Sequence, residues 1–199
     1  MKKLLLFIAI SISSSTVIAQ QKTTITKQES DAILYMREEE KLARDVYEFL
    51  YAKYNVNPFG NIRFSEQTHM DRMKTLISTY NLIDPVEKNG DKPGVFVNPI
   101  MQNYYNELSA AGNPSLTEAL KVGAKIEELD IKDLEDRKKL TKQTDILSAF
   151  DFLIMASENH LRAFVRRLKM QGITYEPIIL SKEAFDKIIA SDNRHPGGN

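Results

Sequence analysis

The sequence predicts an all-α protein built as a four-helix bundle, with a long crossover between the second and third long helices. Two observations lead to this fold class. Four long segments repeat apolar residues at three- and four-residue spacing, which is typical of helices that bury one face. No segment shows the alternation and turn signals of a strand hairpin. The lengths of the connections, described below, then predict how the helices pair.

Capping and breaking residues delimit each long helix. The predicted ranges of the four long helices are 31–54, 66–80, 116–140 and 144–170. Ser30 and Ser65 are the predicted N-caps of the first two helices. Ser115 and Glu118 form a capping-box pattern before the third, and Gly172 ends the fourth.

The connections predict two helical hairpins joined by a crossover. Short loops join the first long helix to the second and the third to the fourth, so each pair should be antiparallel. About 35 residues, 81–115, separate the two hairpins and include a short predicted helix at 99–111. That length is enough to cross the bundle and to begin the third helix from the far end. Ser181 opens a short C-terminal helix that reaches about Ala190.

The first residues have the pattern of an export signal. Lys2 and Lys3 precede an apolar run at 4–10, which is too short to span a bilayer as a helix. Val17 and Ala19 then form a small-residue cleavage pattern. We therefore expect a signal peptide that is cleaved after Ala19 and a secreted or periplasmic location. An N-terminal membrane anchor is the alternative.

Cleavage of the signal peptide, 1–19, would leave one domain at 20–199 with a helical core at about 31–171. Loss of the two leader lysines changes the net charge from zero to about −2. Neither value indicates the clustered basic surface that nucleic-acid binding requires, so no nucleic-acid partner is expected. We also expect no stable membrane anchor after cleavage. The chain has no cysteine, so its stability must come from a packed core, a bound metal, or both.

Charged residues interrupt the apolar faces of the first two long helices. Glu40 shares a face with apolar residues, but Glu39 lies on an adjacent apolar stripe, and periodicity does not choose between them. Glu38 points further round and is expected to be solvated. On the second helix, Glu66 and His69 are three residues apart and therefore meet on one face. Glu-x-x-His on an inward face is a half-site of di-iron and di-manganese carboxylate bundles.

The last two long helices complete the candidate set. Glu127 and Asp130 are three residues apart on the third helix, Glu128 faces away from them, and His160 lies on the apolar stripe of the fourth. Burying a carboxylate costs several kcal/mol unless it is paired or binds a cation. Four carboxylates balance two divalent cations, and oxygen with imidazole ligation favours iron or manganese, with zinc as an alternative. The predicted metal ligands are Glu40, Glu66, His69, Glu127, Asp130 and His160.

Each of these residues also has an ordinary structural explanation. Glu-x-x-His occurs often by chance, and a single charged residue on an apolar stripe commonly extends its head group to solvent. The prediction of a metal centre rests on the conjunction of candidates on all four helices. Without a metal, arginines such as Arg37, Arg44 or Arg162 would have to neutralise the buried carboxylates.

The segments that carry these residues resemble the ferritin-like superfamily. Residues 40–47, EKLARDVY, are similar to a first-helix signature in which a ligand Glu precedes a small residue and then a Tyr, which favours Glu40 over Glu39. Glu66-x-x-His69 matches the second-helix motif. More closely, the chain resembles an uncharacterised ferritin-like family of bacteria and archaea. The matching stretches within residues 31–168 are YMREEEKLARDVY, NIRFSEQTHM, VGAKIEELDIKDL and SENHLRAFVRRL.

The resemblance implies a ferritin-like bundle with two irons per chain. Such a centre would react with oxygen or peroxide, or oxidise Fe(II), as in an oxidoreductase of the ferroxidase or peroxidase type. The expected partners are metal ions and oxygen or peroxide, and a homo-oligomer is compatible with the sequence. Metal storage without turnover and a metal-free structural or binding module that keeps the fold are the alternatives. The residues implied to be catalytic are Glu40, Glu66 and Glu127.

One position departs from the superfamily pattern. The fourth helix usually carries Glu three residues before its His, and here that position is Ser157. Asp130 is the first candidate to replace the missing carboxylate. Glu158 is the second, although it lies about 100° round the helix from Ser157. If neither replaces it, the centre would hold one metal or none.

Overall fold

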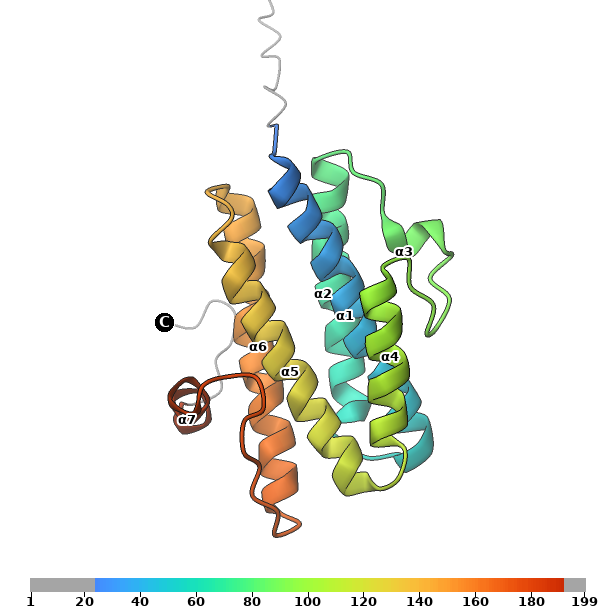
Figure 1. Ribbon diagram of the computed structural model, residues 1–199, viewed down its shortest axis with the longest axis vertical. Coiled ribbons are helices and arrows are strands. Elements are labelled where there is room, and N and C mark those ends of the chain that lie inside the picture. Colours follow the sequence, from blue (N-terminus) through green and yellow to red (C-terminus); the bar gives the residue numbers. More distant parts are fainter. Residues whose placement is uncertain (1–23, 192–199) are drawn as a thin grey trace, which may run out of the picture.

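The computed structural model describes residues 24–191, which form seven α-helices and no strand (Figure 1). The all-α fold class is therefore confirmed, while the predicted signal peptide, 1–19, lies outside the described residues. The long helices are α1 (Lys27–Tyr54), α2 (Phe59–Thr79), α5 (Leu116–Lys138) and α6 (Thr144–Lys169). The shorter helices are α3 (Pro85–Lys88), α4 (Pro99–Gly112) and α7 (Lys182–Ala190).

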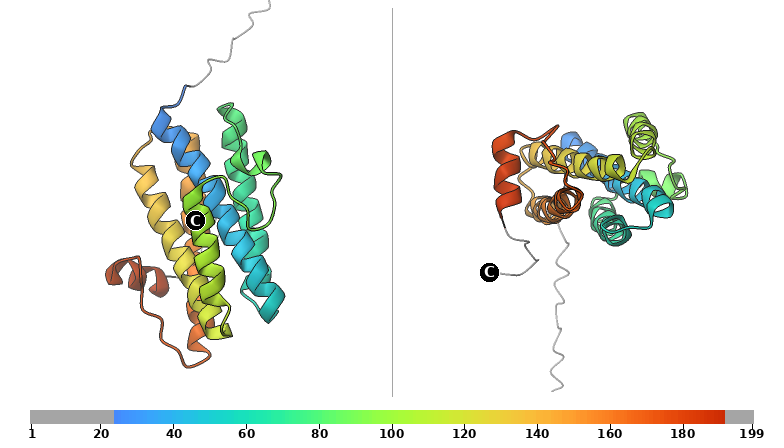
Figure 2. Two further views of the ribbon diagram at one scale, coloured as in Figure 1. Left: turned by 45° about the vertical axis from the view of Figure 1, so that its right-hand side comes forward. Right: turned by 90° about the horizontal axis from the view of Figure 1, so that it is seen from below.

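The four long helices lie side by side as a bundle (Figure 2). The most extensive packing joins α1 to α2 and α5 to α6, as the short loops predicted. The crossover from α2 to α5 carries α3 and α4, and α4 packs against α1 and α5. α7 contacts α6 and crosses the bundle, so that it is seen nearly end-on in Figure 1. Within residues 24–191, no helix combines the length and the apolar character that a membrane span requires.

Two predicted helix starts are wrong, both for local reasons. α1 begins before Ser30, because Thr26 accepts a hydrogen bond from the Glu29 N–H while the Glu29 carboxylate accepts one from the Thr26 N–H at 2.7 Å. This reciprocal pair is a complete capping box. α2 begins directly after Pro58, whose ring restricts φ to the helical range. Ser65 consequently lies inside α2 and is free of any capping role.

Other predicted boundaries agree with the structure. Ser115 caps α5 and Ser181 caps α7, each accepting from a backbone N–H three residues on at 3.2 Å. Asn81, just after α2, has a left-handed φ of 60°. α3 falls in a segment whose turn signals predict no helix. Its first residues are held by Asp84, whose side chain accepts the Val86 N–H.

Two apolar clusters fill the interior and leave a polar belt between them. One cluster contains Tyr47, Phe59 and Phe164, whose ring centroids lie 5.3–5.9 Å apart. The other contains Met36 and Phe150. Along every long helix the candidate ligands fall between residues of these clusters. The candidate centre is therefore enclosed by apolar packing above and below.

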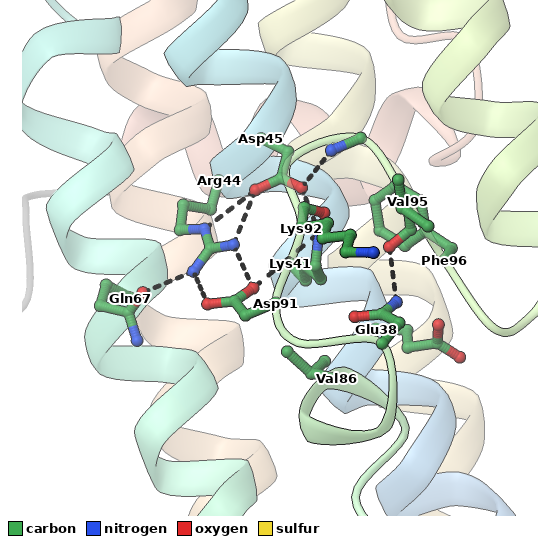
Figure 3. Close-up of polar contacts among 12 residues, drawn as sticks. Glu38, Lys41, Arg44, Asp45, Gln67, Val86, Asp91, Lys92, Val95 and Phe96 are labelled. Carbon is green, nitrogen blue, oxygen red and sulfur yellow. Dashed lines mark hydrogen bonds and ion pairs between the residues drawn. The ribbon is translucent and has the colours of Figure 1, made fainter.

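Buried charges on the outer side of α1 hold the crossover against the bundle (Figure 3). Lys41 is fully buried, pairs with Asp45, and donates to the Lys92 carbonyl at 2.9 Å. Arg44 contacts Asp45 at 2.8 Å and Asp91 at 2.6 Å. Because each charge has a partner of opposite sign, burial beneath the crossover is tolerated.

Two buried glutamates anchor non-helical segments by accepting backbone N–H groups. Glu38 accepts from residues 97–98 at 2.6–3.2 Å, so the prediction that it is solvated is wrong: the crossover covers it. Glu128, on α5, accepts from residues 178–180 at 2.8–3.1 Å and from the Tyr175 hydroxyl at 2.6 Å. Such charge-assisted bonds compensate for the loss of hydration on burial. They fix the chain that leads into α7.

We expect Glu128→Ala to lower the free energy of unfolding by about 3 kcal/mol, because it leaves the buried Tyr175 hydroxyl and three partly buried backbone N–H groups without their acceptor. Urea denaturation followed by circular dichroism measures the change. Glu135→Ala, an exposed position on the same helix, is the matched control and should change stability by less than about 0.5 kcal/mol. Equal stability of the two variants would contradict the anchoring role.

Candidate metal centre

Two groups of three side chains converge at the middle of the bundle. The first group is Glu40, Glu66 and His69, and the second is Glu66, Glu127 and His160. In each group the ligand atoms lie within 4.8 Å of one another. All four long helices contribute, and Glu66 belongs to both groups. Its Oε2 lies 2.8 Å from His69 Nδ1, and its Oε1 lies 3.0 Å from His160 Nδ1.

The remaining contacts complete a nearly symmetric arrangement. Glu40 Oε2 lies 3.1 Å from His69 Nδ1, and Glu127 Oε2 lies 3.5 Å from His160 Nδ1. The two imidazole rings are stacked, with centroids 5.5 Å apart and an interplanar angle of 19°. Nδ1 of His69 faces Glu40 on α1, and Nδ1 of His160 faces Glu66 on α2 and Glu127 on α5. Every member of both groups is buried, and His160 is the most exposed at 9%.

The donor set fits divalent cations. Glu40 Oε1 is buried and makes no hydrogen bond, while Glu66 Oε1 and His160 Nδ1 are buried and pair with each other at 3.0 Å. Within residues 24–191, only histidines form ion pairs with Glu40, Glu66 and Glu127. Buried carboxylates that lack a permanent cationic partner are costly unless protons or metal ions neutralise them. Oxygen and imidazole donors of this kind are common ligands of iron, manganese and zinc.

The arginines considered as alternative partners bind elsewhere. Arg37 pairs with Asp84 at 3.0 Å and donates to the Met70 carbonyl at 2.7 Å. Arg44 pairs with Asp91 on the crossover. Arg162 donates to the Ile188 carbonyl at 3.0 Å and to the Ser191 hydroxyl. Arg37 and Arg44 thus fasten the crossover and leave the central carboxylates to the histidines.

Burial and mutual charge shift the pKa values of the centre in opposite directions. Burial raises the pKa of Glu40 to about 8 and also raises that of Glu127. Burial would raise the pKa of Glu66 as well, but His69 and His160 outweigh it and hold that pKa far below its usual value. Burial alone would lower the pKa of each histidine. The nearby carboxylates outweigh it: Glu127 and Glu66 raise the pKa of His160 to about 9, and Glu66 and Glu40 raise that of His69. Without a cation, the centre neutralises itself with protons.

Asp130 and Ser157 lie beside the two groups. Asp130 belongs to neither group, and its Oδ2 is hydrogen-bonded to the Ser157 hydroxyl. Its Oδ1 is buried without a partner. Burial, followed by the nearby Glu40, raises the pKa of Asp130 well above its usual value. Ser157 therefore contacts the carboxylate that we considered as the replacement for the Glu that the resemblance leads us to expect at position 157.

Two further residues, which the sequence did not single out as ligands, also contact the centre. Tyr47, the Tyr of the first-helix signature, is buried, and its hydroxyl donates to Glu127 Oε1 at 2.6 Å. Ser65 was assigned to a helix cap, but it contacts both His69 and His160. Its position four residues before His69 places it on the same helical face, and this spacing is the signal that could have identified it.

The structure distinguishes Glu39 from Glu40, the two neighbours on α1 that helical periodicity left as alternatives. It is buried, but it belongs to neither group of ligand atoms. Burial, with Asp130 and Asp133 close by, raises its pKa well above the usual value. Glu40 is the residue whose carboxylate reaches the histidine, as the resemblance favours.

The fold and the site define a helical-bundle protein with a buried glutamate and histidine centre. Residues 29–192 match the family model described as "Uncharacterized protein domain (DUF2202)", and the chain belongs to this family. It is 48% identical over 170 residues to uncharacterized protein MJ0754 of Methanocaldococcus jannaschii, covering 85% of this chain and 91% of the relative. The crystal structure of hypothetical protein MJ0754 has a TM-score of 0.84 at 46% identity, covering 88% of this chain and 99% of that one.

We expect the stability of the metal-free protein to fall as pH rises from about 6.5 to 9. The pKa of His160 rises from 6.5 to about 9 on folding, and that of Glu40 rises from 4.5 to about 8. The folded protein therefore holds more protons than the unfolded chain in this window, so deprotonation favours unfolding. Glu66 is ionised in both states and adds no slope there.

Urea denaturation of chelator-treated protein at several pH values measures this dependence. Replacing His160 by Gln should reduce the slope, because one of the groups that titrate in this window is removed while Glu40 remains. Stability that stays constant or increases between pH 6.5 and 9 would contradict the protonated, self-neutralised centre.

Proposed function

We propose that this chain is a ferritin-like metal-binding protein whose buried centre holds two divalent cations. Iron is the first candidate, with manganese and zinc as alternatives. The observation that carries the proposal is the position of Glu66, which belongs to both groups of ligand atoms. One of its oxygens faces His69, and the other faces His160. A carboxylate so placed can bridge two cations. The fold supports the proposal because each long helix contributes at least one ligand, as in carboxylate-bridged bundles.

Each residue then has a defined task. Glu40 and His69 would bind the first cation, and Glu127 and His160 the second, with Glu66 between them. Asp130 supplies a fourth carboxylate, so four negative charges would balance two divalent cations. Asp130 belongs to neither group of ligand atoms, and its buried Oδ1, which has no hydrogen-bond partner, is the atom that would be left to bind a cation.

Two irons in such a centre would supply electrons to oxygen or peroxide, the reactivity that the ferritin-like resemblance favours. The chain's own contribution is enclosure and orientation. Its ligands are at most 9% exposed, so only small reactants such as oxygen, peroxide or a metal ion fit a centre this closed. Tyr47 donates to Glu127 Oε1 and fixes that carboxylate, leaving Oε2 to face His160.

Export is part of the proposal and rests on the leader pattern alone. Processing after Ala19 would release residues 20–199 outside the cytoplasm. A metal-free structural or binding module is the second candidate function. One observation favours it: histidines with raised pKa values neutralise the buried carboxylates through ion pairs, so the fold can persist without metal.

Metal content measured after anaerobic reconstitution with Fe(II) tests the proposal. We expect about two irons per chain in the wild-type protein by mass spectrometry. His69→Ala and His160→Ala should each retain about one iron, because each removes one group. Glu66→Ala should retain almost none, because both groups share this residue.

Glu39→Gln is the matched control for these variants, because Glu39 is buried beside Glu40 but belongs to neither group. It should retain both irons. A folded wild-type protein that binds no iron, manganese or zinc would overturn the metal centre and favour the metal-free module. One iron in the wild type would indicate that Ser157 disables one of the two subsites.

The redox proposal has a separate readout. Fe(II)-loaded protein exposed to oxygen or to peroxide should develop near-ultraviolet ferric absorbance at least about tenfold faster than the Glu66→Ala variant, since that variant loses the shared ligand. Equal rates in the two proteins, with two irons bound to the wild type, would favour binding or storage without turnover.

A further inference from the structure

Ser65 makes an unusual contact, because one hydroxyl lies against both histidines of the centre. Its Oγ is 3.3 Å from His69 Nε2 and 3.1 Å from His160 Nε2. α2 supplies Ser65 and His69 four residues apart on one face, while α6 supplies His160. The Nδ1 atom of each ring faces the carboxylates on the opposite side. Ser65 thus contacts Nε2 of each ring, the nitrogen that does not face the carboxylates.

The number of protons on the two Nε2 atoms decides whether the Ser65 hydroxyl can form hydrogen bonds with both rings. A serine hydroxyl donates one hydrogen bond and accepts two. If both rings presented a bare Nε2, the single hydroxyl proton could serve only one of them. If only one ring presented a bare Nε2, the hydroxyl would accept from one ring and donate to the other, but the neutral ring with the bare Nε2 would carry its proton on Nδ1 and offer no lone pair there to a cation. If both rings carry Nε2–H, both donate to Oγ and fill its two acceptor positions. A neutral ring with Nε2–H has its lone pair on Nδ1, which is the atom that faces the carboxylates.

We propose that Ser65 is a positioning residue that holds His69 and His160 in the Nε2–H form and so directs both Nδ1 lone pairs to the two metal positions. This inference rests on the proposed metal centre. The near-parallel rings, 19° apart, agree with a single anchor at the same edge of both. Hydrogen bonds to the second nitrogen of a ligating histidine fix its orientation and tautomer. Here one side chain performs that task for both subsites.

Two features of the site strengthen this assignment. Ser65 is only partly buried, so its hydroxyl lies at the outer edge of the centre, next to His160, the most exposed ligand. The contacts of Ser65 Oγ with both Nε2 atoms leave both Nδ1 atoms directed at the carboxylates. A cation bound there would meet rings that are already oriented. The centre is oriented before the metal arrives.

Zinc binding by Ser65→Ala, Ser65→Thr and the wild-type protein tests the proposal, with affinities measured by competition against a chelator. We expect Ser65→Ala to weaken both zinc sites by about 10- to 100-fold, as loss of a hydrogen bond to a ligating histidine does elsewhere. Ser65→Thr retains the hydroxyl and should stay within a few-fold of wild type. Ser78→Ala, an exposed serine on the same helix, is the control for the change in helix propensity.

Nitrogen-15 NMR of the histidine rings supplies a readout that a purely structural role would not change. Zinc-loaded wild-type protein should show Nε2–H on both rings, and metal-free Ser65→Ala should lose the fixed ring geometry of wild type while keeping its helical circular dichroism. Wild-type affinity and ring spectra in Ser65→Ala would overturn the inference and leave the metal centre standing. Weakening at one site only would overturn the shared anchor. A wild-type protein that binds no zinc, iron or manganese would overturn both proposals.

Discussion

Glu66 is 2% exposed and lies between two histidines, with one oxygen 2.8 Å from His69 and the other 3.0 Å from His160. A carboxylate buried this deeply can remain ionised only if positive charge stands on both sides of it. The two histidines provide that charge, and Glu40 and Glu127 then face the histidines in turn. This alternation of carboxyl and imidazole groups joins residues from four helices at one level of the bundle. The apolar clusters on either side exclude the water that would otherwise hydrate it.

Neighbouring glutamates in this chain serve opposite sides of their helices. Successive residues of an α-helix point about 100° apart, so adjacent side chains cannot face the same partner. On α5, Glu127 enters the centre while Glu128 binds the amides of residues 178–180. On α1, Glu40 enters the centre while Glu38 binds the crossover. Adjacent glutamates in an acidic run therefore have different tasks. One enters the centre, and another binds the crossover or residues 178–180 on a different side of the same helix.

The comparisons extend the fold beyond this chain. The bundle recurs in the crystal structure of MJ0754 over nearly the whole of that protein, at 46% identity. Any account of the centre in this chain must explain why its carboxylates are placed where burial is most costly. The pair of cations that we propose, with histidines that share Ser65, would account for the buried charges, for the partnerless oxygens of Glu40 and Asp130, and for the orientation of both rings.

The sequence by itself determined the helical class, the two hairpins and the helix faces that carry Glu66, His69, Glu127 and His160, because helical periodicity and loop length are local properties. Periodicity did not choose between Glu39 and Glu40, and the contact with His69 decides for Glu40. The sequence also predicted the caps at Ser115 and Ser181, which depend on neighbours three residues away. It missed the burial of Glu38 and the partners of Arg37, and it placed Ser65 outside the helix. Those features are contacts between residues far apart in the chain. Periodicity gives the face of a helix on which a residue lies, and only the tertiary structure decides what covers that face.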